Sequence, residues 1–283
     1  MAVLDRPSKS IPMPNVPRGH VHSRAQLLER AALALRMQHF AEAEQLAAEV
    51  LKASRTDAAA VSILAQALLA QMRGEEAIAP LEKAARRHKD PTIEILLGKA
   101  LDAGRRRAEG DELLRRAEAR QLAQQFARDG RFGEAIDVLE NALALAPQSV
   151  DLHLDLAQLH MHRNDRRKAR AILLEAQELA RDRSDVLTAL ARVFFLDGEI
   201  ALAADAFRRA LALAPEDAPT RANLAACLLE LGDRDAGEAN LRLAVRGRPQ
   251  MLGPATYALI HSPHGRFFFR RSAAARFLQR EPG

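Results

Sequence analysis

The feature that most constrains the fold is a 34-residue pattern written three times without a gap between Val150 and Met251. Three columns of matching residues show the register: Leu156, Leu190 and Leu224; Ala169, Ala203 and Gly237; Ala176, Ala210 and Ala244. A fixed period of this size is typical of a stacked array, in which each unit buries its apolar face against its neighbours. Such an array is expected to bind other molecules rather than to react with them.

Each unit reads as two helices, because small residues recur at one position in both halves of the repeat. The columns hold Ala31, Ala65, Gly98, Ala123, Ala157, Ala191 and Ala225 in the first half, and Ala43, Ala77, Gly110, Ala135, Ala169, Ala203 and Gly237 in the second. Two antiparallel helices can approach closely only where no bulky side chain separates them. We therefore expect these residues to lie at the contact between the helices.

The residues that end the helices also support two helices per unit. One column holds Gly130, Asn164, Gly198 and Gly232, the residue types that most readily take the left-handed conformation ending a helix. Pro147, Pro215 and Pro249 then stop the second helix. Each unit is thus predicted to be a helix, a tight turn and a second helix.

The pattern resembles the tetratricopeptide repeat family, most clearly over Asp185 to Asp217. The resemblance covers about residues 24–251, or seven units, although the family's aromatic residue near the start of the first helix is absent. It implies an all-α fold, a right-handed α-solenoid of about seven helix-turn-helix units with a C-terminal capping helix or tail.

The period breaks once, because the third unit lacks about nine residues after Gly110. No Gly or Pro occurs from Asp111 to Asp129, and the apolar residues keep a helical spacing there. We expect the second helix of unit three to continue into the first helix of unit four, as one long helix at about 106–129. The alternative is two helices joined by a short kink near Arg115. The fused helix would divide the array into sub-solenoids at 24–115 and 116–251, with their grooves offset.

The two ends differ from the repeats. Residues 1–23 are rich in proline and are expected to be a flexible, basic leader. Residues 252–283 are expected to form a capping helix near Ala255 to His261 and a tail rich in Phe and Arg, with a small helix capped by Ser272. The adjacent Phe267, Phe268 and Phe269 are expected to pack on the end of the solenoid. The alternatives are that they insert into a groove, mediate self-association or dock on another protein.

The charge, the single cysteine and the apolar stretches indicate a protein with a buried apolar core and a charged surface. The net charge of +5 and the arginine runs at 105–107 and 115–116 admit nucleic-acid binding, but charges that solvate the outer helix faces explain them better. Cys227, the single cysteine, lies in an apolar helical run and is expected to be a buried small side chain. The sequence shows no signal peptide and no stretch of 18 apolar residues, so we expect a cytoplasmic protein without a membrane span.

The sequence contains no recognisable catalytic or cofactor-binding motif. Signatures of hydrolases, kinases, dinucleotide-binding proteins and zinc proteases are missing, so we assign no catalytic residue and no cofactor. His153, His160 and His162 lie near Asp151 and Asp155, but His153 and His160 share the face that packs against neighbouring helices. They are interpreted as a satisfied, partly buried pair, with His162 pointing elsewhere, and no metal is assigned.

The family resemblance implies that the first helices line an inner wall, on which the side chains not used in packing form a groove for a peptide. By phase, the groove residues are Ser62, Gln66, Lys99, Asp102, Arg120, Gln124, Asp151, Asp155, Gln158, Asp185, Thr188, Arg192 and Phe195. Some family members hold the C-terminal carboxylate of chaperones with Lys and Asn pairs on successive first helices. Gln66, Lys99, Gln124 and Gln158 occupy those positions here and do not match that pattern.

These observations favour a non-enzymatic adaptor or scaffold that binds a peptide or helical segment of a partner protein. A second hypothesis is a recognition or regulatory subunit, or fragment, of a larger modifying enzyme, since bacterial repeats of this family are often joined to catalytic domains. A third and weaker one is a basic solenoid that binds nucleic acid, with an affinity that falls steeply with salt.

Overall fold

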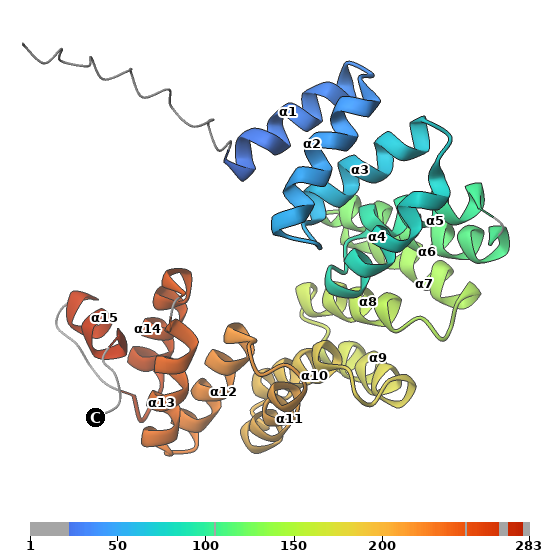
Figure 1. The fold of residues 1–283 in the computed structure, drawn as a ribbon. Helices are drawn as coiled ribbons and strands as arrows, with labels where there is room; N and C mark the ends of the chain where they lie inside the picture. The colour runs from blue at the N-terminus through green and yellow to red at the C-terminus, as the bar shows by residue number, and fades with distance from the viewer. Residues whose placement is uncertain (1–22, 105, 247, 266–270, 280–283) are drawn as a thin grey trace, which may run out of the picture. The chain divides into compact units, whose positions relative to one another are not determined.

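The computed structural model describes residues 23–104, 106–246, 248–265 and 271–279. Within these ranges the chain consists of helices joined by short turns and contains no strand (Figure 1). The helices are α1 (Arg24–Arg36), α2 (Phe40–Ala53), α3 (Ala58–Ala70), α4 (Gly74–Arg87), α5 (Pro91–Ala103), α6 (Arg107–Arg128), α7 (Phe132–Leu145), α8 (Val150–His162), α9 (Arg166–Leu179), α10 (Ser184–Leu196), α11 (Ile200–Leu213), α12 (Ala218–Glu230), α13 (Arg234–Val245), the 3₁₀ turn η1 (Pro249–Met251), α14 (Leu252–His261) and α15 (Arg271–Gln279). The chain divides into two compact units, at residues 1–114 and 115–283.

In the first unit, helices α1 to α5 stack as antiparallel pairs on an aliphatic core. Its main cluster joins α3, α4 and α5 through fully buried side chains such as Val61, Leu81 and Ile93. A smaller cluster joins α1, α2 and α3 through Leu27 and Val50. Each pair therefore buries its apolar face against the next, as the repeat pattern requires.

In the second unit, the hairpins from α7 to α13 pack in the same way. Buried Leu152 and Leu156 of α8 contact the α6 and α7 cluster, while Phe207 of α11 lies within the cluster of α10 to α12. The expected burial of Cys227 is confirmed, because its side chain is fully enclosed in that last cluster and burial raises the pKa of its thiol to about 12.

The two small-residue columns lie where the sequence places them. Every alanine of both columns is at most 2% exposed, and Gly98, Gly110 and Gly237 are buried as well. The glycines mark the tightest approach: a Cβ added to Gly98 would lie 2.5 Å from Cγ of Leu114. The prediction that small residues meet between the helices is confirmed.

The break in the period is a continuous helix. Residues Arg107–Arg128 form the 22-residue helix α6, so the fused helix is confirmed and the kink near Arg115 is not present. Its first turns pack on α5 through Gly110 and Leu114. Its last turns contribute Ala123 and Phe126 to the cluster of α7 and α8. The offset of the two grooves remains a prediction.

The tight turns have the expected left-handed residues. Gly130, Asn164, Gly198 and Gly232 all have φ between 59° and 87°. Two further turns place Gln38 and Met72 in the same conformation, at φ 62° and 60°. The sequence did not reveal these two, because neither residue type favours positive φ.

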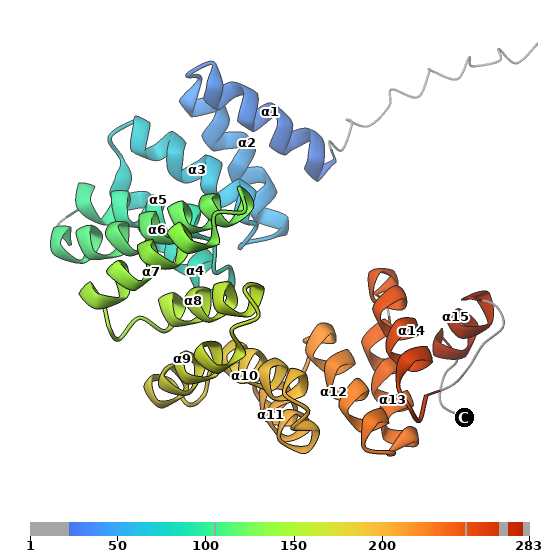
Figure 2. The same cartoon turned by 180° about the vertical axis from the view of Figure 1, so that it is seen from behind.

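The C-terminal helices cover the end of the second unit, where α14 and α15 lie beside α13 in both views (Figures 1 and 2). Leu259 of α14 and Leu278 of α15 are buried in one cluster with α12 and α13, and Arg242 lies 4.5 Å over the ring of Phe277. Ser272 lies inside α15, so the expectation that it caps this helix is wrong. Phe267, Phe268 and Phe269 lie outside the described residues, as do residues 1–22 of the leader.

Candidate functional site

A hollow in the predicted inner face lies between α6 and α8 in the second unit. Four predicted groove residues line this hollow of about 400 Å³: Arg120, Gln124, Asp155 and Gln158. The first two come from α6 and the last two from α8, so the hollow lies between the first helices of two consecutive repeats. The structure thus brings these four side chains together.

A second hollow lies one repeat pair further along the same unit. It measures about 160 Å³ and is lined by Arg192, Phe195 and Leu196 of α10, Phe207 of α11, and Asn223 and Ala226 of α12. Phe195 is half-buried here and forms part of an apolar wall. The two hollows share a face, because Gln124, Gln158, Arg192 and Ala226 occupy one column of the repeat.

An ion pair between neighbouring repeats forms the floor of the first hollow. Nε of Arg120 donates to a carboxylate oxygen of Asp155 at 2.6 Å, and the Arg120 side chain is only 4% exposed. Burial raises the pKa of Asp155 above its ordinary value, while Arg120 acts in the opposite direction and Asp151 adds to the rise. The sequence prediction that Arg120 is a side chain unused by packing needs correction, because the residue is buried and joins α6 to α8.

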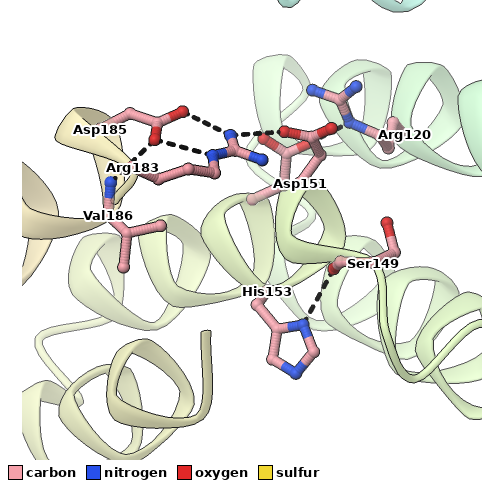
Figure 3. A network of polar contacts seen from close by, with 8 residues as sticks. Arg120, Ser149, Asp151, His153, Arg183, Asp185 and Val186 are labelled. Atoms are coloured by element: carbon pink, nitrogen blue, oxygen red, sulfur yellow. Dashed lines mark hydrogen bonds and ion pairs between the residues drawn. The ribbon is translucent and has the colours of Figure 1, made fainter. Parts of the chain in front are cut away.

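A second network continues the connection from α8 to α10 (Figure 3). A guanidinium nitrogen of Arg183 donates to Asp151 at 2.7 Å. Arg183 also donates two hydrogen bonds to the Asp185 carboxylate, one of them from Nε at 3.0 Å. Burial lowers the pKa of Arg183, but the hydrogen bonds to Asp185 and Asp151 outweigh it and raise the pKa. The Asp151 contact therefore joins adjacent repeats, whereas Asp185 is bonded within its own repeat.

Arg183 differs from the aspartates at three other positions of its column. The residue before the first helix is an aspartate at Asp57, Asp90 and Asp217, and each of these carboxylates accepts a hydrogen bond from a backbone N–H of the first helical turn. Arg183 gives no such cap and reaches the preceding repeat instead. At this position a side-chain cap on the first helix is replaced by an ion pair between repeats.

Other predicted groove residues have different surroundings. Thr188 of α10 forms a 3.1 Å hydrogen bond with buried Thr220 of α12, so its hydroxyl joins two helices. In the first unit, Asp102 of α5 accepts a hydrogen bond from Arg107 at 3.1 Å. The remaining first-unit residues are half-buried Ser62 and exposed Gln66 on α3, and exposed Lys99 on α5.

The residues that line the hollows but were not assigned to the groove from the sequence include Arg128, Phe132, His162 and Asn223. The rings of Phe132 and His162 stack with their centroids 5.8 Å apart. Helical spacing could have indicated His162, because it lies four residues after Gln158 and so on the same helix face.

The buried histidines act as core residues. His153 and His160 are each 3% exposed, and Nδ1 of His153 lies 2.9 Å from the carbonyl oxygen of Ser149. Nδ1 of His160 has no hydrogen-bond partner in the described part of the chain, so the expectation of a satisfied pair holds for His153 only. Burial lowers the pKa of His160 and favours its neutral form. Within the described ranges, no cluster of three His, Cys, Asp or Glu residues could hold a metal ion.

Arg106 and Arg107, the described members of the first arginine run, form contacts within the chain. Arg106 forms ion pairs with Glu82 at 2.9 Å and Glu109 at 2.6 Å, and Arg107 bonds to Asp102. Two of the charges that admitted nucleic-acid binding are therefore paired with carboxylates of the chain itself.

Comparison with known proteins agrees with the geometry. Sequence models described as "Tetratricopeptide repeat" match residues 28–91, 126–193 and 194–250, which together exceed half of the chain. The chain belongs to the tetratricopeptide repeat family. Proteins of this family generally mediate protein–protein interactions. No curated protein sequence gave a significant match.

Among solved structures, the chain is similar to MamA at 19% identity, covering 56% of this chain and 90% of MamA with a TM-score of 0.45. It is similar to TTC0263, a thermophilic tetratricopeptide repeat protein of Thermus thermophilus, at 23% identity, covering 73% of this chain and all of that one with a TM-score of 0.36. It is also similar to YrrB at 15% identity, covering 57% of this chain and 84% of YrrB with a TM-score of 0.45. Among the described helices of this tetratricopeptide repeat protein, none combines the length and apolar character needed to cross a membrane.

Proposed function

We propose that this protein is a non-enzymatic adaptor that binds an extended or helical segment of a partner protein on the inner face of its repeats. The observation that carries the proposal is the pair of hollows, which open between first helices and are lined by residues of one repeat column. Polar side chains alternate there with apolar surface. Such a surface can hydrogen-bond the main chain of a peptide and accept its side chains.

Ion pairs between successive repeats support a preformed binding surface. Arg120 with Asp155 connects α6 to α8, and Arg183 with Asp151 connects α8 to α10. Because these pairs fix neighbouring repeats before a partner arrives, less ordering cost opposes binding. The proposed mechanism is therefore preorganisation of a rigid face by bonds between repeats.

Site-specific photo-crosslinking in the native cell tests the proposal. A photoreactive amino acid replaces Gln124, which lines the first hollow, in the full-length chain. The matched control replaces Arg209, which is exposed on α11. We expect a discrete protein adduct from position 124 and none from position 209. Equal adducts at both positions, or none at 124, would contradict binding on the inner face.

A further inference from the structure

The charges on the inner face of the second unit are unevenly satisfied. Asp151, Asp155 and Asp185 each accept a hydrogen bond from an arginine, as described above. By contrast, Arg128 and Arg192 are exposed, line the two hollows, and have no carboxylate within ion-pair distance among the described residues. Arg128 and Arg192 are therefore cationic side chains on this face that a partner's carboxylates can neutralise.

The two hollows differ in what they can accept. The first exposes mostly apolar surface, but its lining also includes the polar side chains of Gln124, Gln158, His162 and Arg128. Amide N–H groups and a guanidinium are donors suited to a carboxylate.

The second hollow is smaller and more apolar. Its walls include Phe195, Phe207, Ala226 and Leu196, and the Leu196 side chain is 51% exposed. Burying that exposed leucine and the adjoining aromatic surface under an apolar side chain is favourable. Arg192, which also lines this hollow, can pair with a second acidic side chain of the partner next to the apolar side chain.

The repeat sets the distance between the two hollows. Packed helices lie about 8–10 Å apart. The α6–α8 hollow and the α10–α12 hollow are two spacings apart along the row of first helices α6, α8, α10 and α12, so they are separated by roughly 20 Å. An extended chain rises about 3.3 Å per residue and covers that distance in about six residues.

We infer that the inner face of the second unit binds an extended acidic protein segment. One Asp or Glu of this segment lies at the Arg128 and His162 end of the first hollow. A large apolar side chain, about six positions away, fills the second hollow beside Arg192. The inference rests on the proposed function and adds the chemistry of the partner.

A selection from random dodecapeptides displayed on phage, using the full-length protein as bait, tests the inference. We expect enriched peptides to carry an acidic residue and a large apolar residue about six positions apart. Synthetic versions should lose affinity on the order of tenfold or more with Arg128→Glu or with Arg192→Glu, by fluorescence anisotropy. Arg209→Glu on α11 makes the same charge change away from the hollows and should leave affinity unchanged. Circular dichroism confirms that each variant is folded.

A further variant separates the two proposals. Gln158→Trp obstructs the first hollow without changing charge, so it should abolish binding of any peptide held there. Selected peptides that are basic or neutral, yet lost with Gln158→Trp, would refute the acidic partner and keep the groove. Peptides whose binding neither Gln158→Trp nor Arg128→Glu reduces, or a selection without any enrichment, would overturn both proposals.

Discussion

Replacing Gly110 by alanine tests whether the close approach of α5 and α6 is as tight as the structure shows. A Cβ at this position would lie 2.8 Å from the carbonyl oxygen of Gly98 and 2.9 Å from the backbone nitrogen of Asp102. Both atoms belong to the main chain of α5, so no side-chain rotation can relieve the contact. The two helices must therefore move apart.

The expected magnitude is the difference between two effects. Alanine in place of glycine inside a helix stabilises it by about 1 kcal/mol. Overpacking a close contact costs about 1–3 kcal/mol, and a contact with backbone on two sides falls at the upper end. We expect Gly110→Ala to lower the free energy of unfolding of the first unit by about 1–2 kcal/mol.

Two other glycines provide matched controls. A Cβ at Gly133, in the first turn of α7, meets no heavy atom within 4 Å, so Gly133→Ala should stabilise by about 0.5 kcal/mol. At Gly237 the nearest atom is Cγ of the Leu229 side chain at 2.7 Å, which can shift. Gly237→Ala should fall between the other two variants.

Urea unfolding followed by far-ultraviolet circular dichroism measures the three variants beside the parent protein. Repeat arrays often unfold in parts, so hydrogen exchange should locate the loss from Gly110→Ala in α5 and the first turns of α6. Equal stabilisation by Gly110→Ala and Gly133→Ala would refute the close packing inferred here.

Three further sets of measurements follow from the structure. Gly198→Ala should cost about 1 kcal/mol, because φ is 79° and the added Cβ gains no contact, whereas Met72→Gly should not destabilise its turn, as urea unfolding will show. Burial raises the folded-state pKa of Asp155, so the stability of the parent should fall relative to Asp155→Asn as the pH rises from the unfolded-state pKa towards the folded-state one. For Asp57, burial raises the pKa but the hydrogen bonds it accepts prevail and lower it, so its contribution should be lost as the pH falls through the folded-state pKa, and Asp57→Asn should abolish that loss. The thiol of Cys227 is buried, so Ellman's reagent should modify it only at the rate of unfolding, and rapid reaction in the native state would contradict its enclosure.

The sequence predicted the helices and their packing because both follow from a local pattern repeated many times. Closely packed helices accommodate only small residues at their contact, and Ala157 and Ala169, which recur at one phase, are buried there. The missing residues after Gly110 predicted α6, because the segment has no helix breaker. These features depend on spacing alone.

The chemistry of the candidate site was harder to predict, because it depends on which charges meet. Phase placed Arg120 and Asp155 on the inner face but could not show that one neutralises the other beneath its surface. It also gave no sign that the side chain of Arg183, the residue before α10, would bond to the preceding repeat. Such contacts depend on the rotation between helices, which a single sequence does not specify.

The continuity of α6 restricts how this chain can change in length. Gly110 and Ala123 are thirteen residues apart, a rotation of roughly 220° along an α-helix, so they face different neighbours. A single inserted residue between them would turn one of these faces by about 100° and remove it from its partner. Loops such as the one at Gly198 can absorb an insertion, whereas this helix tolerates none, and deletions or duplications of the array should therefore have their endpoints elsewhere.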